Sequence, residues 1–257
     1  DAHISCRPHQ LLQEIAGLID LVTHFYAVFG LTPSYNPSTR PDGAMGDPEL
    51  WNQAEASLEQ ALLNRGIKFN LKPKDGAFYG PKIDVQIEDA IGREWQVATI
   101  QLDFVMLPER FELEYIADDG SRRRPVAIHR AIFGSFERFI GIITEHFVGA
   151  FPAWLAPVQA AVLPITDAQL DYAGKVCDLL KANGLRAEAD ARNEKIGFKI
   201  REWELKKVPY MLVVGEKEKA AGEVAVRQHK KGNVGNVAVS AFLENISQEV
   251  RQKRITS

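Results

Sequence analysis

The stretch HRAIFGSFERFIGIIT, residues 129–144, joins an apolar segment to an amphipathic helix through Gly134 and Ser135. It places Arg138 in the first turn of that helix, where unpaired backbone N–H groups already give partial positive charge. An arginine there is unfavourable unless a phosphate or carboxylate binds beside it. The segment is therefore either an anion site or a helix with a solvated arginine, and neighbouring segments favour the anion site.

The composition is typical of a globular protein, with 257 residues, 46% hydrophobic and 25% charged, which is enough for two ordinary domains. The net charge of -3 excludes an overall basic character, so nucleic acid would have to be bound by a local patch. Cys6 and Cys177 form no metal-type pair, and nothing resembles a signal peptide. The cytoplasm is therefore the expected location.

The longest apolar stretch, residues 150–165, is interrupted by Pro152, Pro157 and Pro164. A membrane-spanning helix would tolerate these prolines poorly, so no contact with a membrane is expected. The proline cluster instead marks a domain boundary. We predict a first domain at residues 1–152 and a second at residues 153–257.

Hydrophobic periodicity predicts helices and an antiparallel sheet in the first domain. Apolar residues at helical spacing indicate helices within residues 11–30 and 47–66. At residues 82–88 the pattern changes to period two, and a second strand at 94–103 completes a hairpin. Residues 125–132 form a third extended segment, which indicates an antiparallel sheet flanked by helices.

The second domain alternates strands and helices, a pattern of α/β folds with a mixed or largely parallel sheet. The strands are expected at 158–163, 186–189, 210–214 and 223–228, and the helices at 168–183, 195–206 and 241–251.

Six blocks, in order along nearly the whole chain, resemble class II aminoacyl-tRNA synthetases, specifically the threonyl-tRNA synthetase family. They are DAHISC from Asp1, STRPDGAMGDPELW from Ser38, GAFYGPKIDVQIEDAIGREWQVATIQLDF from Gly76, HRAIFGSFERFIG from His129, FPAWLAPVQ from Phe151 and ADARNEKIGFKIRE from Ala189. The resemblance implies an α+β class II catalytic domain, with an antiparallel sheet and flanking helices, followed by an α/β anticodon-binding domain. It also implies ATP-dependent activation of L-threonine and its transfer to the 3′ end of a threonine-accepting tRNA.

The chain opens at Asp1 without an initiator methionine and already within a family motif. We therefore expect a C-terminal portion of a longer enzyme that is a homodimer at full length. The family's first motif, a zinc-binding cysteine and an arginine for the ATP α-phosphate would lie upstream. On this view the 257-residue chain alone is inactive.

The resemblance also implies roles for residues of the first domain. Arg138, Gln96 and Lys82 would be catalytic, and Lys82 would line the amino-acid pocket with Asp1 and Tyr79. Asp1, Tyr79, Gln101 and Ser135 would bind threonine or ATP, with Mg²⁺ accompanying the ATP. Amides in an apolar strand need partners, which favours a ligand-facing role for Gln96 and Gln101. Their odd spacing places them on opposite faces of a regular strand, so both reach one ligand only if a bulge or strand end intervenes.

His3 and His129 match two zinc ligands of the family, and the third, a cysteine, would lie upstream. Zinc suits such an enzyme because an apolar pocket distinguishes threonine from valine only about a hundredfold. Sequence spacing alone does not support a metal site, and two such histidines are otherwise ordinary core or surface residues.

Asn193, Lys207, Glu218 and Arg227 match tRNA-binding positions of the family, although an arginine is common at the position of Lys207. Arg192 clusters with them, and Lys195, Lys199 and Lys206 lie on one helical face, which is ordinarily solvated. Such side chains can read single-stranded bases and contact phosphates.

Two alternatives remain open from the sequence. The chain could be a non-catalytic tRNA-binding paralogue that retains the fold, although the presence of Tyr79, Gln96, His129 and Arg138 argues for an enzyme. Prolyl or histidyl specificity is a weaker alternative, which the two matching histidines disfavour.

Overall fold

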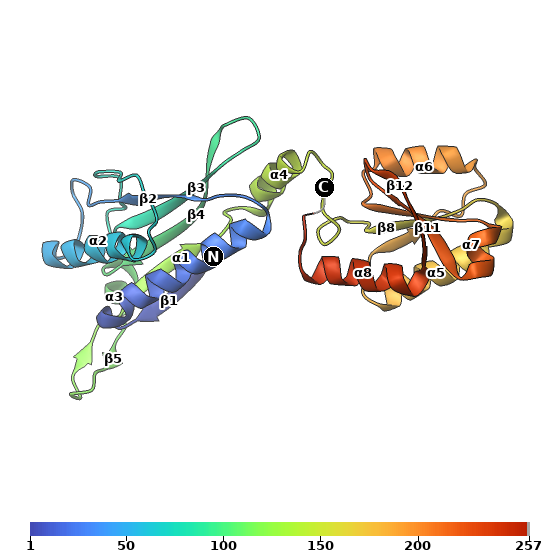
Figure 1. Ribbon diagram of the computed structural model, residues 1–257. Helices are drawn as coiled ribbons and strands as arrows, with labels where there is room; N and C mark the ends of the chain where they lie inside the picture. The colour runs from blue at the N-terminus through green and yellow to red at the C-terminus, as the bar shows by residue number, and fades with distance from the viewer. Residues whose placement is uncertain (256–257) are drawn as a thin grey trace. The chain divides into compact units, whose positions relative to one another are not determined.

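The computed structural model describes residues 1–255 and divides the chain into two compact units, Asp1–Ile143 and Thr144–Ser257. Each unit has its own sheet and its own helices (Figure 1). The units are described separately below. This division lies between residues 143 and 144, whereas the sequence predicted a boundary between residues 152 and 153. The predicted boundary stays a prediction about which part of the chain carries which function.

The first unit is built on a five-stranded sheet in the order β1-β7-β4-β3-β2, in which every neighbouring pair is antiparallel. Its strands are β1 (Ala2–Cys6), β2 (Ser34–Ser38), β3 (Lys82–Glu88), β4 (Glu94–Asp103) and β7 (Val126–Ala131). The antiparallel sheet predicted from the period-two pattern is confirmed. β1 and β2 were not predicted, because both are short and lack a clear alternation.

Two amphipathic helices, α1 (Leu11–Val28) and α2 (Pro48–Leu63), pack against each other, α1 also against β4 and α2 against β2. Asp47 caps α2 by accepting the Glu49 backbone N–H at 2.9 Å. Gly30 and Gly66 follow the helices with φ of +71° and +64°, a conformation that favours glycine and ends a helix. These features confirm the helix limits predicted from the sequence.

The helical stretch Pro8–Val28 is long and apolar enough to cross a membrane by length and composition. Its buried residues lie on one face and include Ile15, Ile19 and Val22, which have no exposed surface. Polar residues such as Asp20 and His24 are exposed on the other side. One face of this helix is therefore packed within the first unit, and the other face carries exposed polar residues.

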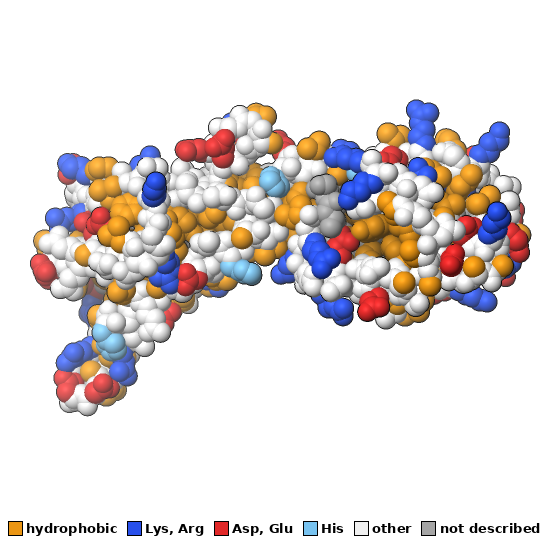
Figure 2. Space-filling model, viewed as in Figure 1, with side chains coloured by type: hydrophobic (Ala, Val, Ile, Leu, Met, Phe, Trp, Pro, Cys, Tyr) orange, Lys and Arg blue, Asp and Glu red, His pale blue; other side chains and the backbone are white. Residues whose placement is uncertain are grey.

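Two small elements of the first unit were not predicted. One is α3 (Met106–Arg110), and the other is a hairpin of β5 (Tyr115–Ile116) and β6 (Arg122–Arg123). Figure 2 shows blue and red side chains intermixed on this projecting hairpin. Its arginines form ion pairs, for example Arg122 with Glu114 at 3.0 Å and Arg123 with Asp119 at 2.6 Å. The hairpin is therefore not a basic patch.

The second unit has a mixed sheet in the order β12-β11-β10-β8-β9. Its strands are β8 (Ala160–Pro164), β9 (Ala187–Ala189), β10 (Tyr210–Val214), β11 (Glu223–Gln228) and β12 (Gly232–Ala238), and its helices are α5 (Leu170–Ala182), α6 (Ile196–Leu205), α7 (Glu216–Ala221) and α8 (Val239–Arg251). β8, β9 and β10 are parallel, and β11 and β12 are antiparallel to their neighbours. The mixed α/β pattern is confirmed, although α7 and β12 were not predicted.

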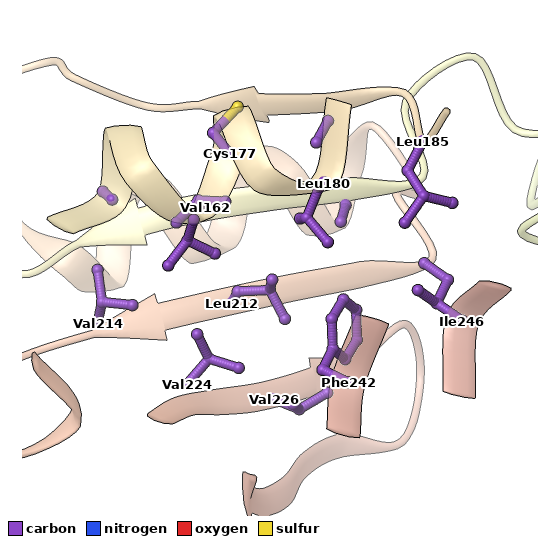
Figure 3. Packing of buried hydrophobic residues seen from close by; sticks show 14 residues of the cluster. Val162, Cys177, Leu180, Leu185, Leu212, Val214, Val224, Val226, Phe242 and Ile246 are labelled. Atoms are coloured by element: carbon purple, nitrogen blue, oxygen red, sulfur yellow. The ribbon is translucent and has the colours of Figure 1, made fainter. Parts of the chain in front are cut away.

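Helices cover both faces of this sheet, but not equally. On one face Leu180 of α5 lies on the side of Val162 of β8, and Phe242 of α8 lies beside Val226 of β11 (Figure 3). On the other face α6 packs over β8 and β10, with Trp203 above Leu163 and Met211. The part of this second face formed by β11 and β12 has no apolar cluster with α6 among the described residues.

The helix α4 (Phe136–His146) follows β7 directly, as the stretch at residues 129–144 predicted. The architecture is thus an antiparallel sheet with flanking helices followed by an α/β unit, and the predicted fold class is confirmed.

Candidate functional site

One face of the first sheet carries a transverse row of polar side chains. The register pairs Lys82 on β3 with Gln101 on β4. It pairs Gln101 in turn with His129 on β7, and His129 with His3 on β1. Residues paired directly across strands project to the same face, so these four side chains share one face. The opposite face is buried and apolar, formed by residues such as Ile83, Val85, Ile100, Leu102 and Ile128.

A β-bulge places Gln96 on the same face as Gln101. β4 contains one extra residue, Val97, because Gln96 and Ala98 pair with consecutive residues of β3. An extra residue reverses the alternation of side chains beyond it. The odd spacing between the two glutamines is therefore compatible with a shared face, as required if both contact one ligand.

Asp84 organises the polar side chains next to this row. Its carboxylate pairs with Lys82 Nζ at 2.6 Å, and it accepts hydrogen bonds from Gln96 Nε2 at 2.7 Å and Thr99 Oγ1 at 3.1 Å. Gln96 and Lys82 are thus held by one buried acid. The sequence analysis did not select Asp84 or Thr99, although Asp84 lies in the polar phase of the alternating strand.

The N-terminus of α4 brings Arg138 to Gln96. The Arg138 backbone N–H donates to Ser135 Oγ at 3.2 Å, which caps the helix, and the guanidinium donates to the Gln96 carbonyl oxygen at 3.3 Å. The guanidinium also lies 5.9 Å from the centre of the Trp95 ring. Ser135 and Arg138, selected from one motif, therefore lie close to Gln96, which was selected from another.

Tyr79 lies beside the histidine row. Its ring centre is 6.1 Å from that of His129. Burial and the charge of Asp103 raise the pKa of Tyr79, whereas Gln101 and Lys82 lower it. The net effect is a raised pKa, so the phenol stays protonated at neutral pH. Asp1 immediately precedes β1, two positions before His3.

Gly80 fixes the turn that carries Tyr79. A Cβ atom at this position would lie 1.7 Å from the Leu102 carbonyl oxygen on β4, which is far inside van der Waals contact. The obstacle is backbone rather than a flexible side chain. Only glycine therefore allows the Tyr79 turn to approach β4 this closely.

We expect Gly80→Ala to lower the free energy of unfolding by about 1–3 kcal/mol, as for other overpacked sites. The measurement is denaturant unfolding of the 257-residue chain. Gly17→Ala in α1 is the matched control, because a Cβ there meets nothing within 4 Å and should be neutral or stabilising. Equal stability of Gly80→Ala and the parent chain would contradict the close approach.

His3 and His129 lie directly opposite each other, with ring centres 4.7 Å apart in an edge-to-face arrangement. His129 Nε2 is 2.9 Å from Asp103 Oδ2. Within residues 1–255 no group of three or more His, Cys, Asp and Glu side chains could hold a metal ion. The pair could therefore supply two ligands of a site that needs a third donor.

In the second unit, Arg227 projects to the sheet face that α5 and α8 do not cover. Its neighbours Val224 and Val226 point into the core beneath these helices, so Arg227, at odd spacing from both, points away from it. Asn236 pairs with Ala225 on this same face. The Arg227 side chain is partly exposed there.

Glu218 on α7 lies close to this face and is held in place at both carboxylate oxygens. Gly215 N–H donates to Oε2 at 2.9 Å, and Asn236 Nδ2 donates to Oε1 at 3.0 Å. Burial raises the pKa of Glu218, but these hydrogen bonds and its own backbone N–H outweigh that effect and lower it. The carboxylate is therefore charged and fixed at neutral pH. Asn236 was not selected from the sequence, because β12 was not predicted.

The loop that carries Asn193 is fixed by an ion-pair network. Arg192 pairs with Asp190 at 2.6 Å and with Glu202 at 2.5 Å, and Trp203 Nε1 donates to Asp190 at 2.9 Å. The charge of Arg192 is thus matched within the protein, which disfavours the RNA contact considered from the sequence. Asn193 remains exposed beside this network.

Lys199 corrects one expectation from the sequence. It was placed on a solvated helical face with Lys195 and Lys206, but it is only 3% exposed. Its Nζ donates to the carbonyl oxygens of Pro164 at 3.1 Å and Asp190 at 3.0 Å. Pro164 ends β8 and Asp190 directly follows β9. The periodicity of the helix alone could not show that these carbonyl oxygens are neighbours of Lys199.

Lys207 lies at the opposite end of α6 from Asn193. Its backbone has a φ of +57°, and its Nζ donates to the Val148 carbonyl oxygen. Glu218 and Arg227 border one sheet face, whereas Lys207 is tied to the segment that precedes β8. The roles of Asn193, Lys207, Glu218 and Arg227 in binding tRNA stay predictions.

Comparison with known proteins connects these sites to a family. The model of the class II tRNA synthetase core domain (G, H, P, S and T) matches residues 1–147. The chain belongs to the class II tRNA synthetase family. A second model, of the anticodon-binding domain, matches residues 159–249 and so covers most of the second unit.

Within this family the similar proteins are threonine–tRNA ligases, which confirms the resemblance identified from the sequence. The enzyme of Desulforamulus reducens is 52% identical over 255 residues, 99% of this chain and 40% of that protein. The enzyme of Acetivibrio thermocellus is 53% identical over 253 residues, 98% of this chain and 40% of that protein. The chain thus spans 40% of the length of these curated relatives.

A solved structure is similar to nearly the whole chain. The crystal structure of the RNA-binding domain of threonyl-tRNA synthetase from Cryptosporidium parvum Iowa II superimposes with a TM-score of 0.90 at 40% identity. The similarity covers 96% of this chain and 62% of that one.

Proposed function

We propose that this chain is part of a threonine–tRNA ligase of the cytoplasm, which activates L-threonine with ATP and transfers it to the 3′ end of its tRNA. The main support is the polar face of the first sheet, where Lys82, Gln101, His129 and His3 form one row beside Arg138. We assign activation to residues 1–152 and anticodon recognition to residues 153–257, in an enzyme that is a homodimer at full length.

Activation needs no side-chain nucleophile, because the threonine carboxylate itself attacks the ATP α-phosphate. In our proposal Arg138 binds the phosphates, Ser135 holds the start of α4, and Gln96 lies beside the Arg138 guanidinium at the nucleotide. Mg²⁺ bound with ATP supplies further charge neutralisation. The contribution of the protein is positioning and electrostatic stabilisation of the transition state.

The threonine pocket would be formed by Asp1, Tyr79 and Lys82, with Gln101 next to Lys82 in the row. The phenol of Tyr79, kept protonated by burial, can donate a hydrogen bond, and the carboxylate of Asp1 can accept one from the substrate ammonium group. Gln101 lies between Lys82 and His129 in the row and so adjoins the proposed amino-acid pocket.

His3 and His129 would hold zinc together with a third donor from outside this chain. Their rings are close enough for a shared ion, and neutral imidazole is a common zinc ligand. A zinc ion held there would supply Lewis-acid chemistry toward the threonine amino and hydroxyl groups, and valine lacks the hydroxyl. The role of the two histidines is to offer one ring nitrogen each from a rigid pair of strands.

The direct test is threonine-dependent exchange of pyrophosphate into ATP by the full-length gene product that contains this chain. Exchange with threonine, and not with proline, histidine or valine, is the expected result. Normal tRNA binding without any exchange would overturn the catalytic proposal and favour the non-catalytic paralogue.

A second expected result concerns tRNA recognition. If Arg227 hydrogen-bonds an anticodon base, Arg227→Ala should weaken use of the cognate tRNA by about 1–3 kcal/mol and leave pyrophosphate exchange unchanged. Arg251→Ala is the matched control, because this arginine ends α8, which packs on the other face of the sheet. Steady-state aminoacylation measures both variants, and impaired exchange in Arg227→Ala would contradict the division of roles.

A further inference from the structure

Asp103 has a saturated set of hydrogen bonds beneath the histidine row. It is fully buried at the end of β4. Its Oδ1 accepts the backbone N–H groups of Val105 at 3.0 Å and Met106 at 2.7 Å, and its Oδ2 accepts that of Leu107 at 3.0 Å. The fourth neighbour is His129 Nε2, 2.9 Å from Oδ2.

This arrangement determines which imidazole nitrogen carries hydrogen. A carboxylate has only acceptors, and three backbone donors already converge on this one. His129 Nε2 can therefore hydrogen-bond to Oδ2 only as a donor. In the neutral ring the lone pair then belongs to Nδ1, the nitrogen that remains free to bind a metal.

We propose that Asp103 is a positioning residue that holds His129 as its Nε2–H tautomer and thereby presents Nδ1 to the metal. The significance for zinc rests on the proposed function, whereas the tautomer follows from the geometry alone. Histidine ligands commonly donate their other ring N–H to a carboxylate, which fixes the ring and raises its basicity. Here the carboxylate is itself immobilised by the first turn of α3, so the orientation of the ring is set before the metal binds.

The tautomer can be measured directly by NMR in the 257-residue chain with ¹⁵N-labelled histidine. His129→Gln identifies the His129 signals, and the spectra are recorded near pH 8, where an ordinary imidazole is neutral. We expect the two-bond ¹H–¹⁵N pattern of the Nε2–H form. The Nδ1–H form, or a charged imidazolium at that pH, would overturn the proposal, since neither leaves a lone pair on Nδ1.

The variant Asp103→Asn tests whether Asp103 determines the tautomer of His129. The amide can keep its oxygen at the Oδ1 position, which turns its NH₂ group toward His129 and favours the Nδ1–H form. Asp47→Asn is the matched control, because Asp47 also caps a helix but lies on α2. A shift to Nδ1–H in Asp103→Asn alone is expected. An unchanged His129 pattern in a folded Asp103→Asn chain would overturn the role of Asp103, and the parent spectrum remains decisive if that variant does not fold.

A zinc titration separates this inference from the proposed function. In the full-length gene product, Asp103→Asn should weaken zinc binding about 10–100-fold, as loss of a supporting carboxylate does elsewhere, and Asp47→Asn should not. If the parent protein binds no added zinc while His129 is Nε2–H, the zinc part of the proposed function fails and the positioning by Asp103 stands. Equal zinc affinity of Asp103→Asn and the parent would overturn the role of Asp103 at the metal.

Discussion

Arg138→Ala is expected to slow threonine-dependent pyrophosphate exchange in the full-length gene product by about a hundredfold or more. This is the range seen when a donor that stabilises transition-state charge is lost. The guanidinium lies at the N-terminus of α4 and 3.3 Å from the Gln96 carbonyl oxygen, so it lies beside a residue that we place at the nucleotide. Exchange kinetics at saturating threonine and ATP measure the effect.

The effect should depend on the position of the arginine and not only on charge. Arg122→Ala is the matched control, because Arg122 is an exposed arginine of the same unit that pairs with Glu114 on the β5–β6 hairpin. It should leave exchange unchanged. Arg138→Lys should remain impaired, because an ammonium group cannot replace the planar two-pronged donor. Normal exchange in Arg138→Ala would show that this arginine is only a solvated residue of an amphipathic helix.

Periodicity predicted the central elements of the fold because their own residues determine them, through burial of one strand face or through the caps of a helix. In β3 the alternation of Ile83, Val85 and Ile87 with polar residues determines which face is buried, and the structure follows it. In α2 the cap at Asp47 and the stop at Gly66 fix both ends. β1 and β12 could not be predicted in this way, because their pairing with other strands determines them more than their own residues do.

Individual residues of the candidate site could be predicted from the sequence, but the contacts between them could not. Gln96 and Gln101 were selected as amides in an apolar strand, yet the extra residue Val97 that unites them depends on pairing with β3. In the sequence Asp103 is an ordinary acid at the end of a strand, and only the fold brings His129 within hydrogen-bond distance of it. Lys199 was misjudged for the same reason, since its carbonyl partners belong to other segments.

His129→Ala in the full-length gene product should lower bound zinc and threonine activation together. Loss of a direct ligand should weaken zinc binding by more than the roughly 10–100-fold that loss of a supporting residue causes. The variant should still fold, because the imidazole is only partly buried and Asp103 keeps its three backbone donors. Metal analysis of the purified protein and pyrophosphate exchange measure the two effects side by side.

Two other histidine variants test whether the loss of zinc in His129→Ala is specific to the proposed metal ligands. His3→Ala should reproduce both losses, because His3 faces His129 across β1 and β7. His24→Ala should change neither, since His24 lies on the exposed side of α1. Full metal content and normal threonine activation in His129→Ala would mean that this histidine only packs against its neighbours. The selectivity of the enzyme against valine would then need a source other than a metal held by this pair.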